Sequence, residues 1–267
     1  MDEEFEKLRN KWYHTDSVSF EIIKTMKYKE SVFLKKGLVI RNLKIDCLMF
    51  FWKNTERYHF FEEDFNLYSS LAQFKNMPMF SFNQNKKREQ SDEWNINFKK
   101  YMVGYDLLLD FDSEKDLNFA YSDTFRVKEI FDKRKIPYNL KFSGKKGFHI
   151  MVEYKHFPIW MKEMDYDTLV NTLKEFAENL SEKHKLNFLD KSIIDIRRIC
   201  KTPYSVVYPY YFVALPLSDE QFENFNLKIV SLPYLLENID NIKYRGLLTR
   251  HENSDTFGDM VKEYNNI

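Results

Sequence analysis

Two aspartates stand two residues apart at the end of a short apolar run, Leu107-Leu108-Leu109. Side chains alternate along a strand, so Asp110 and Asp112 project to the same face if this run is a strand. Neighbouring carboxylates ionise together most readily beside a cation, and Mg²⁺ or Mn²⁺ binds carboxylate and phosphate oxygens together. The pair therefore predicts a divalent-cation site. The alternative is a strand that ends in the polar loop 112–116 and binds no cation.

A glycine- and lysine-containing turn follows some thirty residues later, between two apolar segments. Its glycines allow a close approach of the backbone, its lysines supply positive charge, and a histidine returns on the next strand. These are the components of a phosphate-binding turn. The alternative is an ordinary hairpin with surface lysines and a core histidine. The motif reads Ser143-Gly144-Lys145-Lys146-Gly147-Phe148-His149.

A third acid and a basic cluster complete the set. Asp190 follows the apolar Leu189, and Arg198 and Lys201 come about a dozen residues later. An acid in this position can supply a further metal ligand, and the basic residues can contact phosphates. Asp195 competes for the acidic role, because it too follows an apolar pair, Ile193-Ile194.

The elements that must position these residues alternate between helix and strand. Apolar spacing predicts helices within 3–28, over 122–134 and 167–184, and at the C-terminus over 222–242 and 257–264. Strands are expected over 32–34, 38–40, 47–52, 105–111, 138–142 and 148–154, and the sequence is β-rich over 204–215. The polar stretch 83–92 is expected to be a loop or a boundary between lobes. The order predicts a mixed α/β fold.

Together the three motifs resemble the archaeo-eukaryotic primase superfamily, also called primase-polymerases. That family carries a hydrophobic-Asp-hydrophobic-Asp motif, here 109–112, a Ser-x-x-x-x-x-His motif, here 143–149, and a later hydrophobic-Asp, here 189–190. The segment 201–206, Lys-Thr-Pro-Tyr-Ser-Val, is similar to the Lys-Ser-Pro-Phe-Ser-Val of primase small subunits, and 28–33 is similar to their Arg-Glu-Phe segment, with Lys29 in the arginine position. The resemblance spans residues 29–206. It implies a central mixed sheet of the RRM-like type flanked by helices, in one catalytic domain, 1–267, with a smaller N-terminal αβ lobe (1–98) and a catalytic lobe (99–267).

The resemblance also implies an activity: template-directed nucleotidyl transfer, making DNA or RNA primers on single-stranded DNA with two Mg²⁺ or Mn²⁺ ions. Carried over by residue, Asp110, Asp112 and Asp190 would hold the metals. Nucleotide contacts would come from Ser143, Gly144, Lys145, Lys146, Gly147, His149, Arg198, Lys201 and Lys29. The implied partners are NTPs or dNTPs and a single-stranded DNA template with its primer. Val207 stands where the family commonly has His, which removes one expected phosphate contact.

Two other classes of function compete with this interpretation. A metal-dependent nuclease also uses clustered carboxylates, although it has no need of the nucleotide-binding turn. A non-catalytic accessory subunit of the same fold would not need all three acids. The sequence does not distinguish NTP from dNTP use, primer-free initiation from extension, or replication, repair, mobile-element and CRISPR-associated roles.

Composition limits the partners and the location of the chain. Of its 267 residues, 41 are basic and 41 acidic, so any polyanion must be met by a local patch rather than by global charge. One such patch is expected over 133–155. The acidic N-terminus lacks the features of an export signal, and no stretch approaches the roughly 18 apolar residues of a membrane span. We therefore expect a cytoplasmic protein. The two cysteines, Cys47 and Cys200, are too few for a disulfide framework or a cysteine zinc site, and no zinc is expected.

Overall fold

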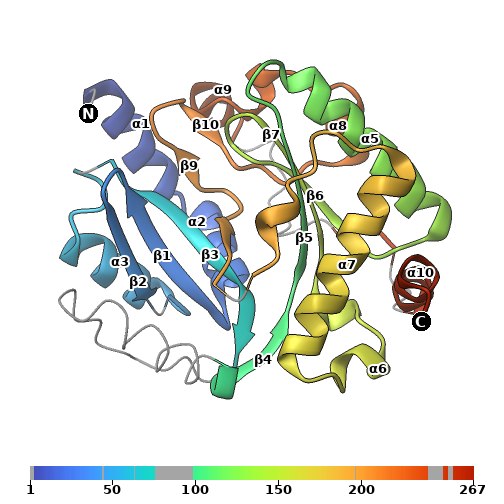
Figure 1. Cartoon of the computed structure of the whole chain (residues 1–267). Coiled ribbons are helices and arrows are strands. Elements are labelled where there is room, and N and C mark those ends of the chain that lie inside the picture. Colours follow the sequence, from blue (N-terminus) through green and yellow to red (C-terminus); the bar gives the residue numbers. More distant parts are fainter. Residues whose placement is uncertain are drawn as a thin grey trace.

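Two antiparallel sheets organise the computed structural model of the chain (Figure 1). The structure describes residues 3–43, 45–62, 64–75, 99–195, 197–239, 249–251 and 255–267. The first sheet has the order β2-β1-β3-β4, and β8 also pairs with β3. Its strands are β1 (Lys29–Lys35), β2 (Leu38–Leu43), β3 (Asn66–Phe74), β4 (Met102–Tyr105) and β8 (Ile199–Lys201).

The second sheet has the order β5-β7-β6 and carries most of the predicted motifs. It consists of β5 (Leu107–Asp112), β6 (Asn139–Phe142) and β7 (Gly147–Val152). Helices α5 (Leu117–Arg134) and α7 (Tyr166–His184) lie on the side of this sheet that faces away from the first one (Figure 1). Alternation places the apolar Leu109 and Phe111 on one face of β5 and leaves Asp110 and Asp112 on the other.

Shorter elements complete the architecture. The remaining helices are α1 (Glu3–Tyr13), α2 (Asp16–Met26), α3 (Leu48–Arg57), α6 (Ile159–Lys162), α8 (Asp219–Glu223), α9 (Leu232–Glu237) and α10 (Asp255–Asn265). Strands β9 (Val206–Val207) and β10 (Phe212–Val213) form a separate hairpin, and 3₁₀ turns occur at Tyr154–His156, Lys191–Ile193 and Leu227–Val230. None of the described helices is long and apolar enough to cross a membrane.

The two sheets are joined by β4 and β5 and by one buried carboxylate between those strands. Asp106 is fully buried and accepts hydrogen bonds from Lys29 Nζ (2.5 Å), Gln73 Nε2 (2.6 Å) and the backbone N–H of Tyr154 (2.8 Å). Because Lys29 and Gln73 belong to the first sheet and Tyr154 follows β7, this carboxylate fixes one sheet against the other.

The α/β class is confirmed, and two of the predicted elements are wrong. Residues 47–52 begin helix α3 rather than a strand. Phe51 and Thr55 are buried four residues apart while Met49 is exposed, which is a helical and not an alternating pattern. A helix is expected over 222–242, but the described part of this range, to residue 239, contains the end of α8, a 3₁₀ turn and α9, with proline in the first turn of α9.

Two further expectations remain predictions. The polar segment 83–92 lies outside the described residues. The expected lobe boundary at 98/99 also adjoins undescribed residues, and two strands beyond it, β4 and β8, belong to the first sheet. The chain therefore returns to its N-terminal sheet after building the second one.

Candidate active site

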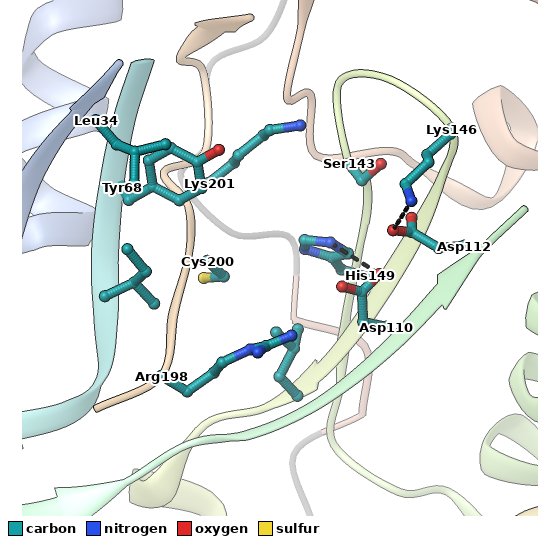
Figure 2. A pocket seen from close by; sticks show the side chains of 12 residues that line it. Leu34, Tyr68, Asp110, Asp112, Ser143, Lys146, His149, Arg198, Cys200 and Lys201 are labelled. Atoms are coloured by element: carbon teal, nitrogen blue, oxygen red, sulfur yellow. Dashed lines mark ion pairs between the residues drawn. The ribbon is translucent and has the colours of Figure 1, made fainter. Parts of the chain in front are cut away.

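A pocket of about 310 Å³ lies between the two sheets and collects most of the predicted residues (Figure 2). One wall comes from β5, β7 and the turn before β7, and the other from β1, β3 and β8. The first wall contributes Leu108, Asp110, Asp112, Ser143, Lys146 and His149. The second contributes Leu34, Tyr68, Arg198, Ile199, Cys200 and Lys201.

The strand register places two of the acids, Asp110 and Asp190, and His149 in one row. His149 pairs with Asp110 on one side and with Lys141 on the other. On the free edge of β5, Phe111 bridges Leu189, and the backbone N–H of Asp190 donates to the Asp110 carbonyl at 2.9 Å. Residues opposite one another in antiparallel strands share a face, so Asp190, Asp110, His149 and Lys141 form one cross-strand row. The sequence motifs thus converge at the backbone level.

Each of the three acids faces a different basic side chain. His149 Nε2 lies 3.3 Å from Asp110 Oδ1, and Lys146 Nζ lies 3.2 Å from Asp112 Oδ2. Arg198 Nη2 lies 3.2 Å from the Asp190 carboxylate. Two of the three acids, Asp112 and Asp190, are therefore paired with charged residues that the sequence assigned to nucleotide binding.

Burial decides the protonation of the histidine. Burial first, and then the neighbouring Lys141 charge, lower the pKa of His149 to about 4. Burial raises the pKa of Asp110, but the His149 ring, Lys141 and Arg198 outweigh it and hold that pKa below its usual range. At neutral pH Asp110 is consequently ionised and His149 is neutral.

The second acid of the pair titrates in the opposite direction. Burial, followed by repulsion from Asp110, raises the pKa of Asp112, and Lys146 only partly offsets both effects. The two carboxylates thus experience the like-charge repulsion that a bound cation relieves.

Two glycines allow the turn before β7 to close against its neighbours. A Cβ atom on Gly147 would lie 1.8 Å from the Phe111 carbonyl oxygen, so only glycine permits this approach of β7 to β5. Gly144 has a φ of +94°, and a Cβ there would lie 2.3 Å from Val207 Cγ2. The backbone N–H of Ser143 donates to Gly147 O at 2.9 Å and closes the turn. Val207 therefore packs directly against the turn.

Two further lysines, Lys141 from β6 and the half-buried Lys201 from β8, lie near the acids. Lys141 is buried, and its Nζ donates to the Lys201 carbonyl at 2.9 Å, which ties β6 to β8 across the pocket. Burial, strengthened by Lys141 and opposed by Asp112 and Asp110, lowers the pKa of Lys201 to about 8. The pocket thus concentrates positive charge opposite the acids.

Six of the predicted residues do not line the pocket: Asp190, Gly144 and Gly147, described above, and Lys29, Lys145 and Asp195. Lys29 is held by Asp106, as described above, and Lys145 is exposed with its Nζ 4.9 Å from the centre of the Tyr210 ring. Asp195 is exposed, and its carboxylate accepts from the backbone N–H of Arg197 at 2.7 Å. Of the two candidates for the third acid, Asp190 is the one bonded to the Asp110 strand.

The predicted basic patch over 133–155 is divided in the structure. Arg134 pairs with Glu263, Lys155 pairs with Glu153, and Lys146 points at Asp112. The basic residues of this stretch therefore do not form one continuous surface.

Sequence reasoning missed one carboxylate that supports the third acid. Asp123 of α5 is 4% exposed and accepts from the backbone N–H groups of Asn187 (2.7 Å) and Phe188 (2.9 Å). It thereby fixes the segment that leads into Asp190. Its place in the first turns of a helix resembles any surface acid in the sequence, so no sequence signal could have identified it.

Buried polar atoms in the pocket are left unpaired. In the part of the chain that the structure describes, Ser143 Oγ and His149 Nδ1 have no hydrogen-bond partner. Such atoms cost stability unless a ligand or water pairs with them. They favour a polar ligand at the junction of the turn and β7.

Neither a family model nor a curated protein matches this chain. Its fold is similar to that of solved structures, among them the polymerase domain of Mycobacterium tuberculosis Ligase D in complex with DNA. The TM-score is 0.55, the sequence identity is 11%, and the match covers 89% of this chain and 88% of that one. The likeness therefore concerns the fold.

Proposed function

We propose that this chain is a nucleotidyltransferase of the primase-polymerase type, which adds nucleotides to a primer on a single-stranded DNA template. The observation that carries the proposal is a pocket lined by Asp110, Asp112 and three residues of the Ser143–His149 turn, with Asp190 hydrogen-bonded through its backbone to the strand of Asp110. The similarity of the fold to a polymerase domain supports it, and so does the resemblance of the motifs to that family.

The residues present suit divalent cations. Carboxylate oxygens are the ligands that Mg²⁺ and Mn²⁺ prefer, and Asp110 and Asp112 share a face beside Asp190. Among the described residues no three acidic, histidine or cysteine side chains form a metal cage, and Lys146 and Arg198 contact two of the three carboxylates. Two bound ions would supply activation of the attacking 3′-hydroxyl and neutralisation of the triphosphate charge.

In this proposal the basic residues contact carboxylates before the metals bind and phosphate oxygens afterwards. When cations neutralise Asp112 and Asp190, Arg198 loses its carboxylate partner and Lys146 keeps only Glu114, 2.6 Å from its Nζ, so both side chains can turn to phosphate oxygens. Lys201 on the facing strand adds a further positive charge. Ser143 Oγ and His149 Nδ1 provide uncharged hydrogen bonds to the same ligand. In this proposal metal and nucleotide binding support each other.

Incorporation of labelled nucleotides into a primed single-stranded template tests the proposal directly. NTPs and dNTPs are supplied in parallel, with Mg²⁺ or Mn²⁺, and pyrophosphate release is measured in the same reactions. The chain should extend the primer and release one pyrophosphate for each nucleotide added. Asp195→Asn is the matched control for Asp190→Asn, because both acids follow apolar residues but only Asp190 is bonded to the Asp110 strand.

Each rival gives a different result. Shortening of the DNA without pyrophosphate release would identify a nuclease, and DNA binding without turnover would identify an accessory subunit. Loss of incorporation in Asp195→Asn but not in Asp190→Asn would mean that Asp195, and not Asp190, is the third metal-binding acid. An unprimed template in the same assay separates priming from extension.

A further inference from the structure

A pair of stacked aromatic rings lies at the edge of the second sheet, next to the acids. The rings of Phe119 and Phe188 are 5.3 Å apart and nearly parallel, with an interplanar angle of 5°. Phe119 belongs to the first turn of α5 and is 46% exposed. An exposed ring that stacks on a second ring offers a flat apolar surface on which a base can stack.

The backbone places this aromatic pair beside a catalytic candidate. The N–H of Asp112 donates to the Phe188 carbonyl at 3.0 Å, and Phe188 lies two residues before Asp190. The pair therefore adjoins the row of acids on the side of β5 away from β7.

The pair is also held in place. Asp123 accepts hydrogen bonds from the backbone N–H groups of Asn187 and Phe188, and it lies one helical turn after Phe119 on α5. Both rings are thus attached to the same helix, one covalently and one through the Asp123 carboxylate. A rigid ring loses little conformational entropy when a ligand stacks on it.

The direction of the reaction indicates which nucleotide would use this surface. In phosphoryl transfer the attacking and leaving oxygens lie roughly in line, on opposite sides of the phosphorus. Two of the basic residues suited to the leaving pyrophosphate, Lys146 and Lys201, lie on the β7 and β8 side of Asp110 and Asp112, whereas Arg198 contacts Asp190 beside the aromatic pair. When Lys146 and Lys201 hold the leaving pyrophosphate, the attacking 3′-hydroxyl approaches from the opposite side, where Phe119 and Phe188 lie.

We propose that Phe119 and Phe188 form a stacking platform for the base of the primer's 3′-terminal nucleotide. This inference rests on the proposed function and names the partner of that site. Aromatic side chains bind bases by stacking without regard to sequence, which suits a primer end that changes at each step.

The test measures binding and needs no catalysis. Fluorescence anisotropy of a labelled primer–template in EDTA compares the wild type with Phe119→Ala, Phe119→Tyr and Phe20→Ala, the last an exposed phenylalanine of α2. Phe119→Ala should weaken binding roughly fivefold or more, the lower end of the range for one aromatic ring. Phe119→Tyr and Phe20→Ala should bind like the wild type. Circular dichroism melts establish that every variant is folded.

A second primer carries an abasic residue at its 3′ end. The wild type should bind this abasic primer more weakly than the normal primer. Phe119→Ala should bind the abasic primer as well as the wild type does, because the base that the ring would contact is absent. Equal affinity of Phe119→Ala and wild type for the normal primer would overturn the platform. So would the same fold-loss with both primers.

The two proposals fail separately. A wild type that shows the coupling between Phe119 and the terminal base but never incorporates a nucleotide would refute the polymerase activity and keep the platform. A wild type that extends primers without the coupling would do the reverse.

Discussion

Replacement of His149 by glutamine tests the electrostatics of the site most sharply. The folded protein holds the pKa of His149 at about 4, whereas an unperturbed histidine titrates near 6.5. Between these pH values the His149 side chain is protonated in the unfolded chain and neutral in the folded chain. The free energy of unfolding therefore falls as the pH is lowered through this window.

The size of this effect follows from the two pKa values. A difference of about 2.5 pKa units corresponds to about 3 kcal/mol when the pH is below both values. Between pH 7.5 and pH 4.5 the part due to His149 is about 2.5 kcal/mol, since the folded-state proton is still largely absent at the lower pH. Glutamine carries no titrating group, so the variant should lose that part of the pH dependence.

Urea unfolding of the wild type and His149→Gln at both pH values gives the measurement, with the exposed His59→Gln as the matched control. Between pH 7.5 and pH 4.5, the free energy of unfolding of the wild type should fall by about 2.5 kcal/mol more than that of His149→Gln. Equal losses within about 0.5 kcal/mol, the scatter of such extrapolations, would refute a neutral buried His149.

The same variant tests the contact with nucleotide. A neutral histidine gives an ordinary hydrogen bond of about 0.5 to 1.5 kcal/mol, so His149→Gln should weaken binding roughly two- to tenfold and not more. Isothermal titration with a non-hydrolysable nucleotide measures this at pH 7.5. A hundredfold loss in a folded variant would mean that the histidine is charged when the nucleotide is bound.

Three further outcomes are expected. Asp110→Asn and Asp112→Asn should abolish incorporation, and Asp112→Asn should not lower the melting temperature in EDTA, because Asp110 repels the charge it removes; a clear decrease would indicate a structural role for Asp112. The affinity of the wild type for nucleotide should weaken as the pH rises through about 8, where Lys201 loses its proton. Lys201→Met should bind nucleotide weakly and without that pH dependence. An unchanged pH profile in Lys201→Met would mean that Lys201 does not contact the phosphates. Gly147→Ala should destabilise the protein by about 1 to 3 kcal/mol in urea unfolding, because its Cβ meets the Phe111 carbonyl; wild-type stability would contradict the close strand approach.

The short motifs were predictable because each depends on local geometry. Alternation along β5 required only that 107–112 be a strand, and the paired glycines at 144 and 147 marked a tight turn. Both expectations match the structure. The apolar run around Phe51 misled the prediction, because a short apolar segment has no period that separates strand from helix.

Long-range pairing was beyond the sequence. Strand β3 occupies the centre of the first sheet, yet its neighbours β1, β4 and β8 come from three distant segments. Lys29 shows the consequence. Its sequence context suggests a nucleotide contact, but the pairing of β1 with β3 brings its amine to the buried Asp106.

The charge state of the site also depends on distance in space rather than along the chain. A sequence with balanced charges gives no sign that Asp112 and Asp190 face Lys146 and Arg198, or that burial leaves His149 neutral. These contacts change the expected chemistry. Lys146 and Arg198 already contact Asp112 and Asp190 before a nucleotide binds, so a cation that takes their place at these carboxylates frees Arg198 and leaves Lys146 with Glu114 alone. A site built in this way should bind a metal–nucleotide complex more tightly than the separate affinities for metal and nucleotide would predict.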